Sequence, residues 1–133
     1  MTITITDEIE KKSLLIGYKT FIYKRSLKAF AKKSGYGDDG GGYMGIFFKA
    51  DLEEEPYEFQ QELSEIKNNQ VVLNVSYPAT ISDAKDAEEV VYIDFDEFYD
   101  YLVEVVDERI SETPSDKAEY EQLLSEVKTA LGL

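Results

Sequence analysis

The chain has 133 residues, of which 43% are hydrophobic and 32% charged, so it can bury one core and is too apolar to be wholly disordered. Its 28 acidic and 14 basic residues give a formal net charge of −14, which disfavours direct binding to nucleic acid or anionic lipid. The absence of Cys and His excludes disulfides, thiol nucleophiles, Cys/His zinc sites and Ser-His-Asp catalysis. We expect one domain, residues 1–133, without a cofactor.

Targeting signals are not predicted either. The N-terminus is polar and then charged, unlike the apolar run and small-residue cleavage site of a secretory signal. The longest uncharged run, residues 68–82, is too short and too rich in Asn, Ser and Thr to form a transmembrane helix. We therefore expect a cytoplasmic protein that does not bind membranes.

Charge changes sign along the chain. Residues 1–36 hold eight basic and three acidic residues, a net of +5, whereas residues 37–133 have a net charge of −19. The change falls at the glycine-rich stretch 35–42. Two interpretations stay open: the basic segment packs against the acidic body, or much of the acidity is left for a partner.

The first predicted element is an amphipathic helix over residues 13–33. Its apolar residues recur at helical spacing and lysines fill the other positions. Gly35 is expected to end the helix in the left-handed conformation, and Gly17 weakens its middle. Packing against the rest of the protein is the favoured role, because the acidic remainder opposes membrane or nucleic-acid binding.

Three strands and a short helix are predicted next. The runs 43–49, 71–77 and 90–95 are rich in aromatic and β-branched residues, and the last two alternate with a period of two. Between the first and second strands, residues 56–67 place Phe59, Leu63 and Ile66 at spacings of four and three, which favours a helix.

Two helices close the sequence. The first begins after Asp94, which is expected to cap it while Glu97 reaches back to the chain. Its apolar stripe is formed by Phe98, Leu102, Val105, Val106 and Ile110. Its opposite face carries five acids whose mutual repulsion only Arg109 relieves. The second helix is expected to begin at Thr113, Pro114 and Asp116.

The element order indicates a small α/β (α+β) domain, with a sheet of three or more strands and about four helices. Helix capping explains Asp94 and Glu97 better than a metal site does, and no metal is expected. Asp38 and Asp39 precede glycines, but the stretch lacks the alternating ligands of a calcium loop. No catalytic constellation is found, because 28 acids produce carboxylate pairs by chance.

The remaining hypothesis is a binding surface for a basic protein. Many acids are interleaved with ten Tyr and seven Phe, and tyrosine is a favoured anchor of protein interfaces. The first candidate set consists of loop residues: Tyr36, Asp38, Asp39, Tyr43, Asp51, Glu53, Glu54, Glu55 and Tyr57. The second candidate set is the acidic helix face: Glu97, Asp100, Glu104, Asp107 and Glu108.

Several segments together carry a family resemblance. They are the turn SGYGDDG at 34–40, the acidic stretch DLEEE at 51–55, the run YIDFDEFYDYL at 92–102 and the segment ISETPSDK at 110–117. This arrangement resembles the small acidic immunity proteins of contact-dependent growth inhibition (CDI) and related polymorphic toxin systems, especially those paired with ribonuclease toxins. The similarity extends from about Leu27 onward.

The resemblance implies a cytoplasmic inhibitor, not an enzyme, that binds a cognate toxin domain. The expected partner is a basic nuclease, the C-terminal domain of a large secreted toxin. The charge agrees, because nuclease sites are cationic to hold phosphates and an acidic body can block them. Two alternatives remain open: a DNA mimic that occupies a nucleic-acid-binding protein, and a carboxylate-based hydrolase or metal-dependent enzyme with a concave site and an acid of raised pKa.

Overall fold

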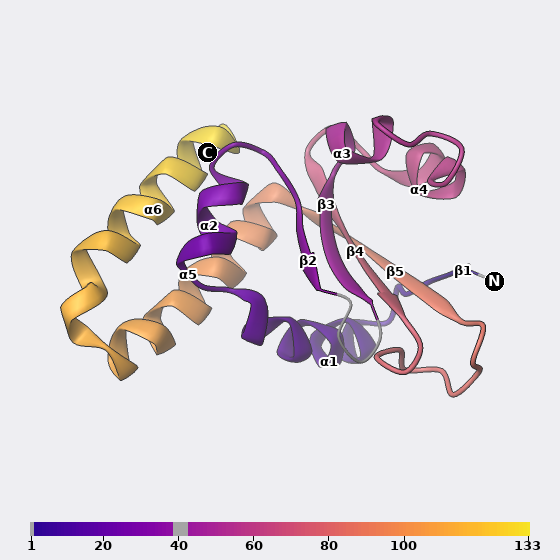
Figure 1. Ribbon diagram of the computed structural model, residues 1–133, viewed down its shortest axis with the longest axis horizontal. Coiled ribbons are helices and arrows are strands. Elements are labelled where there is room, and N and C mark those ends of the chain that lie inside the picture. Colours follow the sequence, from indigo (N-terminus) through magenta and orange to yellow (C-terminus); the bar gives the residue numbers. More distant parts are fainter. Residues whose placement is uncertain (1, 39–42) are drawn as a thin grey trace.

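A computed structural model describes residues 2–38 and 43–133 as an α+β domain, which confirms the predicted fold class (Figure 1). In chain order the elements are β1 (Thr2–Thr4), α1 (Glu8–Tyr18), the 3-10 turn η1 (Lys19–Phe21), α2 (Lys24–Phe30), β2 (Tyr36–Asp38), β3 (Met44–Phe48), α3 (Lys49–Glu53), α4 (Gln60–Glu65), β4 (Gln70–Ser76), β5 (Glu88–Asp94), α5 (Phe95–Glu112), the 3-10 turn η2 (Pro114–Asp116) and α6 (Lys117–Ala130).

The strands form one mixed sheet in the order β1-β5-β4-β3-β2. β1 runs parallel to β5, and the other neighbours are antiparallel. The three predicted strands correspond to β3, β4 and β5, which are confirmed. The sequence analysis missed β1 and β2, because strands of three residues at the edges of a sheet are too short for a period-two pattern to show.

The main core lies between one face of the sheet and four helices, α1, α2, α5 and α6. Ile46, Leu73 and Val91 are in register on β3, β4 and β5, and each is 1% exposed. The predicted stripe of α5 is buried at Phe98, Leu102, Val105 and Val106, and Ile110 packs against its edge.

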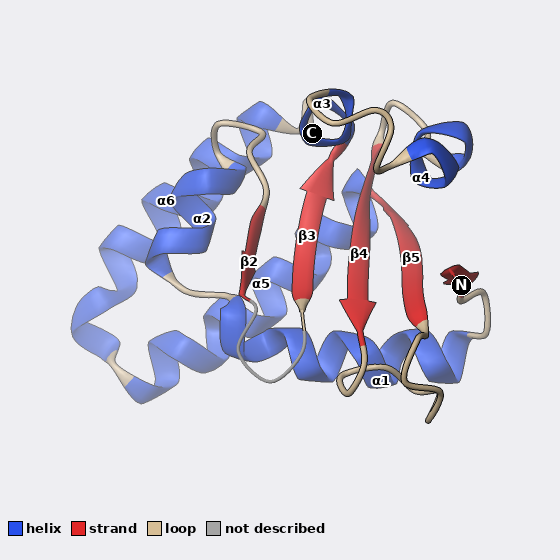
Figure 2. Ribbon diagram, turned by 45° about the vertical axis from the view of Figure 1, so that its right-hand side comes forward, coloured by secondary structure: helices blue, strands red, loops and turns tan. Residues whose placement is uncertain are grey.

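A second, smaller core lies on the opposite face of the sheet. On that face α3 and α4 cover one end of the strands, whereas α1, which packs in the main core, lies near the other end of the strands (Figure 2). Leu52 and Ile66 pack from the two-helix segment onto Val72 and Val90 of the sheet. Because α3 and α4 are short, they cover only part of this face, and the remainder is accessible to a ligand.

The predicted single helix over 13–33 is wrong, because the chain breaks it into α1 and α2. Ile22 and Tyr23 adopt extended backbone angles, so the two helices point in different directions. Two carbonyl groups at this break accept hydrogen bonds from Arg109 of α5, whose Nη2 donates to Lys19 O at 2.6 Å and whose Nε donates to Ile22 O at 3.0 Å. Tertiary contact thus stabilises a break that periodicity did not reveal.

Three predicted helix ends also differ. Lys33, not Gly35, takes the left-handed angle after α2, with φ 53°. Gly35 is needed for another reason, since a Cβ there would lie 2.4 Å from Ile46 O. Neither Asp94 nor Thr113 caps a helix with its side chain; Asp94 instead accepts a hydrogen bond from Gln70 Nε2 at 2.9 Å.

Helix lengths and compositions bear on membrane insertion. Within residues 2–38 and 43–133, the helices are all too short or too polar to span a bilayer.

Candidate functional site

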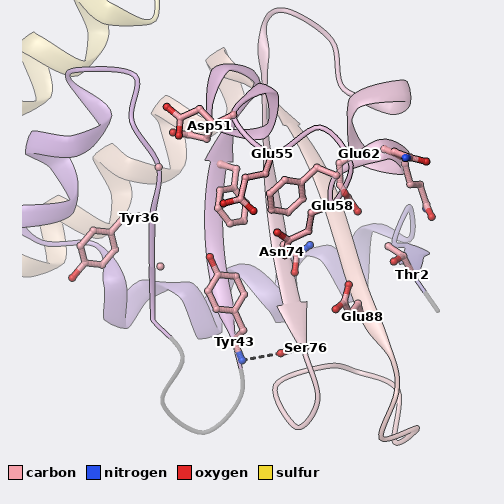
Figure 3. Close-up of a pocket in the computed structure, with 17 residues that line it drawn as sticks. Thr2, Tyr36, Tyr43, Asp51, Glu55, Glu58, Glu62, Asn74, Ser76 and Glu88 are labelled. Carbon is pink, nitrogen blue, oxygen red and sulfur yellow. Dashed lines mark hydrogen bonds between the residues drawn. The ribbon is translucent and has the colours of Figure 1, made fainter.

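The open part of the second sheet face forms a cleft of about 740 Å³ beside the α3–α4 segment (Figure 3). Six carboxylates line this acidic cleft, and none of the described lining residues is Lys or Arg. The six are Asp51, Glu54, Glu55, Glu58, Glu62 and Glu88. They come from α3, from the turn after it, from α4 and from the start of β5, so only folding brings them together.

Aromatic rings form the floor of the acidic cleft, and one of them lies over two glycines. Gly37 and Gly45 are register partners on β2 and β3, and the Tyr43 ring lies over both. A Cβ on Gly45 would lie 2.6 Å from the Tyr43 hydroxyl, so a larger residue there would displace the Tyr43 ring. Tyr43 stacks on Phe47 at 6.1 Å between centroids, and Phe47 contacts Phe59 at 5.4 Å.

Glu62 is the most deeply placed acid of the cleft, with 4% of the residue exposed. Burial raises the pKa of its carboxyl, and the like charges of Glu88 and Glu65 raise it further. One turn later, Glu65 is well satisfied: it accepts hydrogen bonds from the hydroxyls of Tyr92 at 2.8 Å and Thr4 at 3.2 Å. Glu62 has no such donor from another residue among those described, although both side chains extend from α4.

Glu58 and Glu55 form a close pair of carboxyl groups. The pKa of Glu58 is raised by the hydrogen bond that its protonated carboxyl donates to Glu55 and by the like charge of Glu55. Two carboxyl groups this close share a proton more readily than they tolerate two negative charges. The acidic cleft therefore holds negative charge at a cost, and a cation entering it would remove that cost.

The first candidate set is partly assembled at this cleft. Five of its nine members line the cleft: Tyr36, Tyr43, Asp51, Glu54 and Glu55. Two of these side chains also have structural roles: Asp51 Oδ2 accepts from Phe48 N at 2.7 Å at the start of α3, and the Tyr36 hydroxyl hydrogen-bonds that of Tyr23.

The other four members of the first set are not placed at the cleft by the described residues. Glu53 and Tyr57 are exposed beside it, and Tyr57 is 90% exposed in the turn between α3 and α4. Asp38 belongs to β2 through its backbone pairing with Met44. Asp39 lies outside the described residues.

The second candidate set does not form the uncompensated face that the sequence predicted. Glu97 pairs with Lys11 of α1 at 2.6 Å, and Glu108 pairs with Lys19 at 3.1 Å. Asp100 and Glu104 line a groove of about 550 Å³ that they share with lysines of α1. Asp107 lies on the other side of α5, in a groove that also contains Lys117 and Lys128. The basic N-terminal segment therefore packs against this acidic helix, as one of the two interpretations held.

Sequence reasoning missed three acids of the cleft: Glu58, Glu62 and Glu88. Glu55, Glu58 and Glu62 follow one another at spacings of three and four. The helix predicted for residues 56–67 rested on its apolar residues alone, so this acidic spacing was not used. Glu88 had no local signal, because its position beside the others depends on its pairing with Ser76 and Thr2 across the sheet. In the part of the chain that the structure describes, no group of three or more acids is arranged to hold a metal ion.

Comparisons with known proteins give the family. A search of curated proteins and a search of solved structures each found no match. A family model described as CDI immunity protein matches residues 6–124, which include every element from α1 to α5 and most of α6. The chain therefore belongs to the CDI immunity protein family, whose members neutralise toxins.

Proposed function

We propose that this protein neutralises a toxin nuclease, specifically a ribonuclease. It would bind the cationic substrate surface of that nuclease through the acidic cleft. The observation that carries the proposal is a concave surface with six carboxylates and no basic residue among the described residues that line it. Members of the first candidate set surround it, with exposed Tyr57 at its side as an anchor. The α5 acids would contribute at most at the margin, because lysines already pair with two of them.

Charge supports this assignment physically. A nuclease holds phosphates with Lys and Arg, so carboxylates in a complementary arrangement can occupy the same groups. The net charge of −14 accelerates association with such a partner and makes binding sensitive to salt. The protein would act by binding alone, in the cytoplasm, on the C-terminal domain of a large secreted toxin.

The hydrolase alternative is favoured by one observation: the cleft is concave and contains acids of raised pKa. The geometry of the Glu55–Glu58 pair does not suit it. Glu55 and Glu58 are within hydrogen-bonding reach, whereas retaining glycosidases keep their two carboxyl groups about 5–5.5 Å apart to admit the sugar. The DNA-mimic alternative needs unpaired acids along α5. Two of the five acids of that face are ion-paired within the protein, which weighs against it.

Calorimetry with the purified toxin domain, at low and moderate salt, tests the proposal. We expect nanomolar binding that weakens with salt and a parallel loss of nuclease activity. Binding that leaves cleavage intact, or no binding at all, would contradict inhibition for that pair. Glycoside hydrolysis by the protein alone would support the alternative.

A further inference from the structure

We propose that the loop between β4 and β5, residues 77–87, is a second contact segment for the toxin, and that buried Glu89 holds this loop in the conformation that binds. The loop supplies an apolar contact beside the acidic cleft. This inference rests on the proposed function and deepens it, because it describes the toxin surface as a cationic group with an apolar side chain next to it.

The loop is longer than its place in the sheet requires. β4 and β5 are antiparallel neighbours, and Ser76 at the end of β4 pairs with Glu88 at the start of β5. About two to five residues are enough to join such strands. All residues from 77 to 87 are described, and they form turns and bends instead of a helix or strand. Binding residues occur disproportionately on loops that a rigid scaffold holds in place.

Glu89 fixes the tip of this loop. The residue is 2% exposed, and its two carboxylate oxygens accept hydrogen bonds from the backbone N–H of Ile81 at 2.7 Å and from that of Ser82 at 2.9 Å. Burying a carboxylate costs free energy, and these two hydrogen bonds offset that cost. Because both donors belong to the tip, the carboxylate determines the conformation of the tip. A loop that is ordered before binding loses less conformational entropy when a partner binds.

The ordered loop presents apolar side chains in a strongly charged protein. Two of the large apolar residues exposed at the described surface belong to it: Tyr77 is 38% exposed and Ile81 is 39% exposed. Residues 77–82 carry no charge and lie within the longest uncharged run of the chain, 68–82. This part of the loop therefore suits an apolar side chain of a partner better than a charged one.

The position of the loop brings this contact next to the cleft. Ser76 and Glu88, which flank the loop, both line the cleft, and Figure 3 shows them at its lower end. Successive side chains of a strand point to opposite faces, so Glu89 points away from the cleft and the tip lies at the end of the sheet. A stable interface buries about 800 Å² on each partner. A toxin that occupies the cleft therefore also covers the surface that flanks it.

A double-mutant cycle in toxin binding tests the proposal. Ile81→Ala removes the apolar contact, whereas Glu89→Gln keeps the shape of the side chain but leaves only one of its two terminal atoms able to accept a hydrogen bond. We expect each variant to bind the purified toxin domain about tenfold more weakly. The combined variant should lose about 10- to 20-fold, because both changes act on one contact. Unchanged affinity for Ile81→Ala, or a combined loss of about 100-fold, would overturn the proposal.

Two matched controls lie away from the loop. Leu133→Ala truncates a residue that is 48% exposed at the C-terminus, which lies on the other side of the molecule in Figures 1 and 2. Asp94→Asn removes a carboxylate that accepts a hydrogen bond at the opposite end of β5. Both controls should keep toxin affinity within about threefold of the parent. Losses as large as those of the loop variants would overturn the proposal.

Amide hydrogen exchange of the free protein separates positioning from general stability. We expect Glu89→Gln to accelerate exchange at Ile81 and Ser82, while Leu102 in the buried stripe of α5 keeps the rate of the parent. Equal acceleration at all three amides would overturn the role of Glu89, because it would indicate a less stable fold instead of a loosened loop.

Salt dependence separates the loop contact from the cleft. Salt does not screen an apolar contact, so the loss caused by Ile81→Ala should be equal at low and moderate salt. The loss caused by Glu58→Gln/Glu62→Gln in the cleft should shrink as salt rises. If only this cleft variant binds as tightly as the parent, the proposed function fails in its choice of surface and the loop contact stands. If only the loop variants bind as tightly as the parent, the loop contact fails and the proposed function stands.

Discussion

Two regions of this protein are similarly rich in acids, but they differ in whether basic residues lie next to those acids. The α5 face carries five acids, but two of them form ion pairs, one with Lys11 of α1 and one with Lys19 of η1. The acidic cleft carries six, and none of its described lining residues is basic. The pKa of Glu58 and of Glu62 is raised in the cleft, whereas Glu97 and Glu108 of α5 are held in ion pairs.

The difference shows that the number of carboxylates in a segment does not identify a binding site. On α5 two of the five acids form ion pairs with Lys11 and Lys19, so part of the negative charge is neutralised within the domain. In the cleft the acids repel one another, so their charge is available to a partner. The four predictions that follow test this contrast, from the largest expected effect to the smallest.

Reversing one charge in the cleft should separate binding from stability. Glu58→Lys places a cation beside Glu55, so we expect the melting temperature to rise while toxin affinity falls at least about 100-fold. Calorimetry and thermal denaturation measure the two effects. Glu104→Lys on α5 is the matched control, and it should weaken binding much less. A cleft variant that loses stability together with affinity would contradict the view of the cleft as an uncompensated site.

Removing Arg109, which joins α5 to the break between α1 and α2, should lower stability and leave toxin binding almost unchanged. Arg109→Ala removes the side-chain hydrogen bonds to the carbonyls of Lys19 and Ile22, so we expect about 2 kcal/mol loss in the free energy of unfolding. Toxin affinity should stay within about threefold. Urea denaturation measures the loss, and Arg25→Ala, an exposed position on α2, should cost less than about 0.5 kcal/mol. Equal costs would refute a special role for Arg109.

Truncating the exposed tyrosine beside the cleft should affect binding only. Tyr57 is 90% exposed, so Tyr57→Ala should leave the unfolding free energy within about 0.5 kcal/mol of the parent. We expect about tenfold weaker toxin binding if this ring is an interface anchor. Ile9→Ala is the control, since Ile9 is 80% exposed on α1, away from the cleft. Equal affinity for both variants and the parent would remove Tyr57 from the contact surface.

The smallest expected effect is a pH dependence from the cleft acids. The folded pKa of Glu58 and Glu62 lies above the ordinary 4.5, so the folded state binds their protons more tightly than the unfolded state does. The destabilisation is complete above the folded pKa and is relieved as pH falls through it toward 4.5. We expect the melting temperature of the parent, relative to that of Glu58→Gln/Glu62→Gln, to rise as pH falls through this range.

Binding should respond in the opposite direction over the same range. Protonated cleft acids no longer attract a cation, so toxin affinity should decrease as the melting temperature increases. Parallel pH profiles of stability for the parent and the double Gln variant would show that these two acids carry no excess charge energy.

Much of the fold could be read from residue spacing. The period of two in β4 and β5 and the apolar stripe of α5 predicted these elements, because each repeats over many residues and buries one face. Shorter features gave no usable pattern. The break between α1 and α2 depends on Arg109, which lies 87 residues after Ile22, and α3 has only five residues.

The candidate site was predicted less completely. The acids of 51–55 were recognised as a charged stretch near the glycine turn, and part of that stretch does line the cleft. The α5 acids formed the second candidate set, because the sequence could not show which lysines would pair with them. The sequence predicts a helix around Glu62 but not the burial of this residue, since that burial arises from the sheet beneath α4.

The sequence alone specifies the strongly acidic character of this protein, the separation of its charge into a basic beginning and an acidic remainder, and the α+β class. These properties depend on composition and on local periodicity, which need no knowledge of long-range contacts. Tertiary structure decides which carboxylates are neutralised and which are left to act. Lysines of α1 reach α5, whereas pairing across the sheet brings Glu88 beside acids of the α3–α4 segment, so distant contacts determine where the unpaired charge collects.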